Sequence, residues 1–160
     1  SHMKNILIVS NSDTCRSRMA QEILNSFGRG MKISTAGVLV GNSVPDVVCQ
    51  VMEQNGYDFS RRKPCDVATY AQQTWDYVIT LCPEAEEVQK EMQGVVRKYV
   101  SFNFADPFRG GIHADDEQEE RVVVLYDAMH KELYEFFRNE LMEKLLPRCS
   151  CGANTYCRCE

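Results

Sequence analysis

Short apolar runs alternate with amphipathic helical patterns along this chain, and the alternation constrains its fold more strongly than any other feature. Apolar runs of strand length occupy residues 4–9, 31–36, 76–81 and 97–102. Strands that are separated by helices pair in parallel, because each crossover returns the chain to the same edge of the sheet. The sequence therefore predicts an α/β fold with a small four-stranded parallel sheet flanked by helices.

Helices are predicted in the segments between and after these strands. Their apolar residues recur at intervals of three and four, as in helices that bury one face. Gly28 and Gly30 end the first helix, and Pro45 begins the second at its favoured first position. The expected ranges are 17–27, 45–55, 67–73, 84–92 and 115–146, with Pro147 ending the last helix.

Three candidate chemical features follow the ends of three predicted strands. They are the segment Ser10–Ser17 after the first strand, Cys82 after the third and Asp106 after the fourth. In parallel sheets the carboxyl ends of the strands lie at one edge, and ligands bind in the crevice beyond that edge. We therefore expect these features to converge at one site.

The segment Ser10–Ser17 has the character of an anion-binding loop. It leads from a strand into a helix N-terminus, where backbone N–H groups and the helix dipole favour negative charge. Arg16 adds a planar guanidinium that suits a tetrahedral oxyanion, and Ser17 can cap the helix. The simpler alternative is a capped turn beside a surface arginine. The expected anion-binding residues, with phosphate or sulfate as the ligand, are Asn11, Ser12, Asp13, Thr14, Cys15, Arg16 and Ser17.

The same segment, V-S-N-S-D-T-C-R-S, resembles the C-x5-R-S phosphate loop of the low-molecular-weight protein tyrosine phosphatases and of their relatives, the thioredoxin-coupled arsenate reductases. The resemblance extends over residues 4–146 and includes Ser34-Thr35-Ala36-Gly37, Thr80-Leu81-Cys82 and Asp106-Pro107. It implies a flavodoxin-like three-layer fold, an arsenate or phosphate-type oxyanion as substrate and no required cofactor.

Two details of the resemblance favour the arsenate reductases. Arg18-Met19-Ala20 follows the Arg-Ser pair, as in the reductase pattern C-R-S-x-M-A, whereas the phosphatases usually have proline there. Cys82 is similar in position to the second redox cysteine of the reductases. The resemblance then implies that Cys82 attacks the sulfur of the arsenic-bound cysteine, releases arsenite and leaves a disulfide. Thioredoxin or glutaredoxin is the expected partner.

The loop departs from the family pattern at its first position and in its middle. Family members have the nucleophilic cysteine where this chain has Ser10, and a serine hydroxyl is far harder to ionise than a thiol. The chain as written is therefore expected to bind oxyanions without effective catalysis. Ser10 is either an engineered Cys-to-Ser change or a natural variant. Ser12 and Asp13 replace the usual Gly-Asn, and the charge of Asp13 opposes an incoming anion.

Asp106 and Cys82 each have a catalytic and a structural interpretation. The resemblance implies that Asp106 is the general acid that protonates the leaving group, but an aspartate before proline is also common in turns. Cys82 is either the second redox thiol or a buried cysteine at a strand end. The third cysteine of the reductases has no counterpart in residues 84–92, so a resolving thiol has to come from elsewhere in the chain.

A polar, cysteine-rich tail follows the last predicted helix. It holds two C-x-C pairs that are separated by five residues, namely Cys149 and Cys151, then Cys157 and Cys159. Four thiolates could form a zinc site, hold a thiophilic ion such as arsenite, or supply the resolving thiol. A thiol-rich terminus without such a site is the remaining alternative.

Length and charge limit the classes of function. The 160 residues suit one domain over residues 4–146 with a tail over 147–160, and Ser1-His2-Met3 resembles a tag remnant and initiator methionine. The net charge of −5 argues against a nucleic-acid partner. No apolar run approaches the roughly 20 residues that a membrane span needs. We expect a cytoplasmic protein, because eight cysteines without a secretion signal favour redox chemistry or metal binding over structural disulfides.

The leading functional interpretation is an arsenate reductase-like enzyme that Ser10 inactivates. The first alternative is a low-molecular-weight tyrosine phosphatase. Phe108 could be an aromatic wall for the phenyl ring, but residues 41–46 lack the aromatic residue that the phosphatases tend to place there. The second alternative is a non-catalytic protein that binds oxyanions or metalloids.

Overall fold

A computed structural model describes residues 3–109 and 116–147 of the chain. Its centre is a four-stranded parallel sheet in the order β3-β1-β4-β5. The strands are β1 (Lys4–Ser10), β3 (Met31–Gly37), β4 (Trp75–Thr80) and β5 (Val96–Ser101). Ser10 pairs with Gly37 on one side of β1, and Val9 pairs with Thr80 on the other. The predicted parallel α/β sheet is confirmed.

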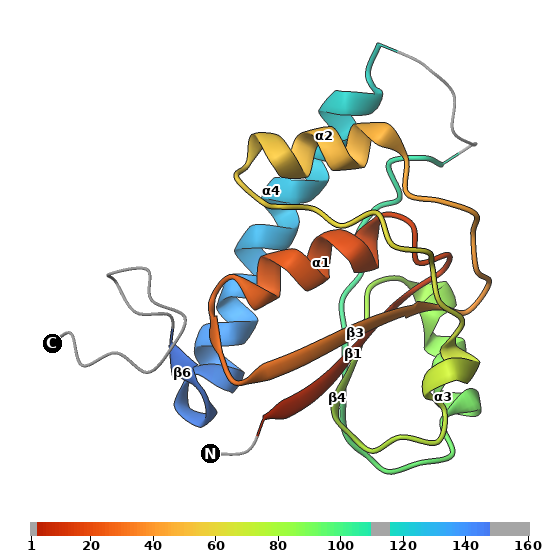
Figure 1. Cartoon of the computed structure of the whole chain (residues 1–160), viewed down its shortest axis with the longest axis vertical. Helices are drawn as coiled ribbons and strands as arrows, with labels where there is room; N and C mark the ends of the chain where they lie inside the picture. The colour runs from red at the N-terminus through yellow and green to blue at the C-terminus, as the bar shows by residue number, and fades with distance from the viewer. Residues whose placement is uncertain (1–2, 110–115, 148–160) are drawn as a thin grey trace, which may run out of the picture.

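Helices cover both faces of this sheet and complete three layers (Figure 1). One face carries the longer helices α1 (Arg16–Asn25), α2 (Asp46–Gln54) and α4 (Gln118–Phe136). The other face carries the short helices η1 (Val67–Tyr70), η2 (Pro83–Glu87) and α3 (Val88–Glu91). The helix that was expected over residues 84–92 is thus a 3-10 turn followed by a single α-helical turn.

The middle of the central strand β1, residues 6–9, is apolar because both of its faces are buried. Ile6 and Ile8 point into the larger core cluster, under α1, α2 and α4. Leu7 and Val9 point into the smaller cluster on the opposite face. All four side chains are fully buried. This alternation is what a parallel strand between two helical layers requires.

The end of the chain differs from the predicted long helix. After α4 come a π-helical turn, η3 (Phe137–Leu141), and a 3-10 turn, η4 (Met142–Lys144). Strand β6 (Leu146–Pro147) then pairs antiparallel with β2 (Gly28–Arg29), so the expected helix through residue 146 is wrong there. The chain turns because Leu145 is buried in the larger core cluster. The predicted helix start at residue 115 lies outside the described residues.

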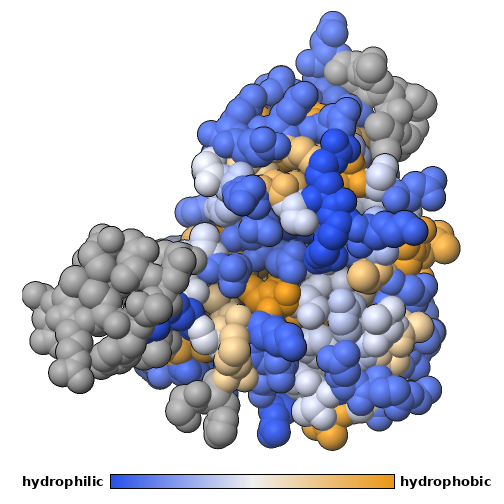
Figure 2. Space-filling model, viewed as in Figure 1, coloured by the Kyte–Doolittle hydropathy of each residue, from blue (hydrophilic) through white to orange (hydrophobic). Residues whose placement is uncertain are grey.

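No helix within residues 3–109 and 116–147 combines the length and the apolar character that crossing a bilayer demands. The face drawn in Figure 2 is mainly hydrophilic, with apolar side chains in small separate groups.

The tail with Cys149, Cys151, Cys157 and Cys159 lies outside the described residues, so the predicted domain boundary near residue 147 stays a prediction.

Candidate oxyanion site

The segments after β1, β4 and β5 lie side by side at the carboxyl edge of the sheet. The Leu81 N–H donates to the Val9 carbonyl at 3.0 Å, and the Phe104 N–H donates to the Leu81 carbonyl at 2.9 Å. Arg16, at the end of the first segment, donates from Nη1 to the Phe104 carbonyl at 2.8 Å. The chain continues from β1 to β3 on one side, whereas β4 lies on the other, so this edge is a topological switch point. The predicted convergence of the three segments is present.

The loop between β1 and α1 turns sharply at Asp13. Asp13 has a φ of 59°, the left-handed region that aspartate and asparagine adopt more readily than most residues. α1 begins at Arg16, and its N-cap residue, Cys15, makes no side-chain capping hydrogen bond. Ser17 lies in the first turn of the helix, where its hydroxyl bonds Asp13. The expectation that Ser17 caps the helix is therefore wrong, whereas the expectation that its hydroxyl donates to a neighbouring group is confirmed.

Ser10, Asp13 and Ser17 form a buried hydrogen-bonded chain beneath the loop. The Ser10 hydroxyl donates to Ser17 Oγ at 2.9 Å, and the Ser17 hydroxyl donates to Asp13 Oδ1 at 2.7 Å. The Asp13 N–H donates to Ser10 Oγ at 3.2 Å. The second carboxylate oxygen, Oδ2, accepts the Cys65 N–H at 2.9 Å. The Asp13 side chain is thus fully buried and bonded on both oxygens.

The end of strand β3 and the residues that follow it support the loop from the side, which the sequence interpretation did not include. The N–H groups of Leu39 and Gly41 donate to the carbonyls of Asn11 and Ser12 at 2.8 Å and 2.9 Å. A Cβ on Gly37 would lie 2.7 Å from the backbone carbon of Ser12, so only glycine fits this position. Gly37 ends the Ser-Thr-Ala-Gly stretch of the family resemblance, which was the available signal for this contact.

Arg16 lies at the mouth of the loop and is 5% exposed. Besides its bond to Phe104, it donates from Nη2 to Asn11 Oδ1 at 3.1 Å. The same nitrogen is 3.9 Å from Asp106 Oδ2. The fixed guanidinium and the N-terminus of α1 both favour an oxyanion at this position.

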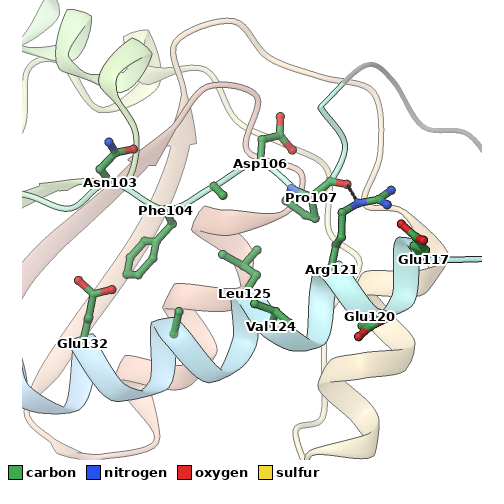
Figure 3. A pocket seen from close by; sticks show the side chains of 12 residues that line it. Asn103, Phe104, Asp106, Pro107, Glu117, Glu120, Arg121, Val124, Leu125 and Glu132 are labelled. Atoms are coloured by element: carbon green, nitrogen blue, oxygen red, sulfur yellow. Dashed lines mark hydrogen bonds between the residues drawn. The ribbon is translucent and has the colours of Figure 1, made fainter.

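Asp106 is placed at the same mouth, with its side chain 34% exposed. Its Oδ1 accepts the Phe108 N–H at 2.9 Å, which is a local turn bond. A cavity of about 560 Å³ lies beside it, between residues 103–107 and α4. In Figure 3 the Phe104 ring points toward α4, whereas the Asp106 carboxyl group points away from it. This carboxyl group is therefore available to a ligand at the loop.

Cys82 follows β4 and is only 1% exposed. It packs in the smaller apolar cluster with Ala85 and Val88. Burial raises the pKa of the Cys82 thiol, and the nearby charge of Arg16 acts in the opposite direction. Burial likewise raises the pKa of Cys15 within the loop, again against Arg16. Both thiols are therefore protonated at neutral pH.

Arg18 is a second arginine of the site that the sequence interpretation used only as part of a motif. Its side chain is 2% exposed and donates to the carbonyls of Arg62 at 2.7 Å and Ser60 at 2.9 Å. Burial lowers the pKa of Arg18, as does Arg62, and Asp13 opposes both effects. These bonds hold the segment that carries Cys65, whose N–H binds Asp13.

Metal ligands do not gather in the described part of the chain. Within residues 3–109 and 116–147, no group of three or more His, Cys, Asp or Glu side chains has the arrangement of a metal site. The four tail cysteines that could bind zinc or arsenite lie outside this part, so their role stays a prediction.

Comparisons with known proteins agree with this fold. The family model described as "Low molecular weight phosphotyrosine protein phosphatase" matches residues 5–144. A tyrosine phosphatase from Erwinia amylovora superposes with a TM-score of 0.67 at 14% identity, over 86% of this chain and 93% of that one. An arsenate reductase solved in a phosphate-binding state superposes with a TM-score of 0.64 at 20% identity, over 85% and 98%.

A curated relative is named as an arsenate reductase. The glutaredoxin arsenate reductase of Synechocystis sp. is 29% identical to this chain over 80 residues. The matched stretch is 50% of this chain and spans 61% of the length of that relative. Both branches suggested by the loop motif are thus represented among the similar proteins.

Proposed function

This chain belongs to the low-molecular-weight phosphotyrosine protein phosphatase family, and from this premise we propose that its loop binds a tetrahedral oxyanion and that its thiol-bearing form reduces arsenate. The observation that carries the proposal is that Arg16, Asp106 and Cys82 belong to three segments that meet at the carboxyl edge of the sheet, where β1 ends at position 10. The likeness to a glutaredoxin arsenate reductase supports arsenate over phosphotyrosine.

The proposed reaction needs a cysteine at position 10. Its thiolate attacks the arsenic of arsenate, an As–S bond forms, and the displaced oxygen leaves as water after Asp106 donates a proton. Arg16 and the N-terminus of α1 stabilise the negative oxygens. Cys82 then attacks the sulfur at position 10, and the As–S electron pair goes to arsenic. Arsenate is thereby reduced to arsenite while a disulfide forms, and a thioredoxin- or glutaredoxin-type dithiol reduces that disulfide.

Ser10 blocks this reaction at its first step. Ser10 is 1% exposed and its hydroxyl donates a hydrogen bond to Ser17, so the hydroxyl is held as a neutral group. A serine cannot form the disulfide that the second step requires. The chain as it stands is therefore proposed to bind oxyanions without reducing them.

Phosphotyrosine hydrolysis is the second candidate function. It is favoured by the position of Asp106 near Arg16, which suits protonation of a phenolate leaving group. It needs a thiol at position 10 but makes no use of Cys82. The difference in the need for Cys82 separates the two reactions experimentally.

The test compares Ser10→Cys with the double variant Ser10→Cys/Cys82→Ser. Each is assayed for arsenate reduction with a thiol reductant and for hydrolysis of an aryl phosphate. We expect Ser10→Cys to reduce arsenate and the double variant to lose that activity. Aryl phosphate hydrolysis that survives in both variants would favour the phosphatase. Phosphate binding without either activity would favour a non-catalytic oxyanion binder.

The four tail cysteines are proposed as thiol ligands or as the source of the resolving thiol. Cysteine thiolates are soft ligands, which suits them to zinc or arsenite. Elemental analysis of the purified protein, with thiol titration before and after zinc addition, tests the metal role. Absence of bound metal and of thiol protection by zinc would remove it.

A further inference from the structure

The hydrogen bonds beneath the loop run in one direction. An ionised carboxylate only accepts hydrogen bonds, so the Ser17 proton has to point to Asp13 Oδ1 at 2.7 Å. Ser17 Oγ then accepts the Ser10 proton at 2.9 Å. Ser10 Oγ in turn accepts the Asp13 N–H at 3.2 Å. In this arrangement, a protonated group at position 10 has both an acceptor for its proton and a donor to its own lone pair.

An ionised group at position 10 would require the Ser17 hydroxyl, in the middle of this series of hydrogen bonds, to change the group to which it donates. A thiolate accepts hydrogen bonds and donates none, so Ser17 would have to turn its single proton from Asp13 toward position 10. Asp13 is fully buried, and its Oδ1 would then lose this donor. The negative charge of Asp13 also repels a thiolate. Both effects favour the protonated form.

Other charged or titratable groups lie around the loop, and their effects on an anion at position 10 differ in sign. Arg16 and the N-terminus of α1 favour an anion there, whereas Asp106 at the loop mouth disfavours it. Cys82, beyond the end of β4, is a neutral thiol at neutral pH. Arg18 and Arg62 lie behind Asp13, and the electrostatic coupling of Arg18 to Asp13 offsets part of the carboxylate charge. Asp13 alone among these groups controls the direction of the Ser17 hydrogen bond.

We infer that Asp13 is a positioning residue which, by holding the Ser17 proton, keeps the group at position 10 protonated. The inference rests on the proposed function in one respect, that the active form carries a thiol at this position. The family pattern has asparagine where this chain has Asp13. A thiol at position 10 should therefore ionise at a higher pH in this loop than it would beside an asparagine amide.

The test compares the thiol of Ser10→Cys with that of Ser10→Cys/Asp13→Asn. The asparagine carbonyl can accept the Cys65 N–H while its NH2 group donates to Ser17, which frees the Ser17 proton for the thiolate. Alkylation of residue 10 by iodoacetamide is followed against pH by peptide mass spectrometry, which separates it from the other cysteines. We expect the midpoint to fall by about one pH unit, which is a tenfold change in the ionisation constant.

A second variant tests the role of the Ser17 proton without altering Asp13. If Asp13 holds that proton, Ser10→Cys/Ser17→Ala moves the midpoint by less than about half a pH unit, because the thiolate loses no donor. A rise of about one unit or more would show that Ser17 already donates to position 10, and this would overturn the inference.

The matched control is Ser10→Cys/Asp127→Asn, because Asp127 is an exposed acid on α4. Its midpoint is expected to equal that of Ser10→Cys. An Asp13→Asn shift no larger than the control shift would overturn the inference. Alkylation uses neither arsenate nor phosphate, so it tests the role of Asp13 independently of the proposed function. Failure of the proposed function would be seen separately, if the Ser10→Cys protein turned over neither arsenate nor an aryl phosphate.

Discussion

Arg16 is the residue on which the proposed oxyanion binding depends most directly. Its guanidinium is almost fully buried, and the carbonyl of Phe104 and the amide oxygen of Asn11 hold it at the loop mouth. A rigid fork of this kind binds two oxygens of a phosphate or arsenate at once, which a lysine cannot do.

We therefore predict that Arg16→Lys weakens phosphate binding at least tenfold, which corresponds to about 1.4 kcal/mol. Isothermal titration calorimetry with inorganic phosphate measures the change. Arg61→Lys is the matched control, because Arg61 forms an exposed ion pair with Asp46 outside the loop. Equal affinities for the two variants would contradict the proposed anion site.

Cys82 gives a prediction about pH. Burial raises its pKa, so the thiol is neutral at neutral pH and becomes nucleophilic only as the pH rises. In the Ser10→Cys protein, the rate of disulfide formation after arsenate binding should increase with pH through the ordinary thiol pKa of about 8.5 without a plateau there. A rapid-quench assay of the disulfide measures this rate. A pH-independent rate between pH 6 and 8 would exclude Cys82 as the attacking thiol.

At the scale of elements, the oxyanion loop is a joint product of β1, β3 and α1. β1 delivers the first residue of the loop, α1 begins at Arg16, and β3 packs its last residue, Gly37, against the loop backbone. The loop geometry therefore depends on a glycine that touches no ligand.

Gly37→Ala should destabilise the fold by about 1–3 kcal/mol through overpacking and should also weaken phosphate binding. Gly56→Ala is the contrasting variant, because Gly56 has a φ of 89° and its Cβ would meet open space, so any cost there is backbone strain and not overpacking. It should cost about 1 kcal/mol and leave phosphate affinity unchanged. Urea unfolding and phosphate titration of both proteins test this pair, and identical phosphate affinities would disprove the packing argument.

The sequence was a good guide to elements that are specified by local periodicity. The four parallel strands and α1 were predictable because their apolar residues are spaced as burial on a sheet or helix requires. The β2–β6 ribbon was not, because two residues on each side carry no periodicity and their pairing joins positions about 120 apart. The prediction of where the last helix ends was wrong for the same reason, since burial of Leu145 in the core is a tertiary contact that local periodicity does not specify.

The same distinction holds for the candidate site. The placement of Arg16, Asp106 and Cys82 at one edge of the sheet was predictable because each follows a strand whose carboxyl end lies there. The contacts of Arg18 and of the Cys65 N–H could not be predicted, because both depend on how residues 60–65 fold back over the loop. The carboxylate of Asp13 was expected to oppose an anion, but its two hydrogen bonds could not be read from the sequence.

At the scale of the whole molecule, the described structure accounts for the fold without the cysteine-rich tail. Among the residues whose burial the structure describes, Leu145 is the last in the larger core cluster, and β6 ends at Pro147. A chain truncated after Pro147 should therefore keep its unfolding free energy within about 0.5 kcal/mol and bind phosphate unchanged. Urea unfolding and calorimetry measure both quantities. A loss of stability beyond about 2 kcal/mol would show that residues 148–160 belong to the folded domain.

The central claim is that this molecule has an oxyanion site and that catalysis there depends on one atom: position 10 carries the oxygen of serine where an active form would carry the sulfur of cysteine. The most direct measurement is the turnover of arsenate, with a thiol reductant present, by the unaltered chain and by Ser10→Cys. We predict no turnover by the unaltered chain and Cys82-dependent release of arsenite by Ser10→Cys. Arsenate reduction by the unaltered chain, or a Ser10→Cys protein that acts on neither arsenate nor an aryl phosphate, would contradict the account.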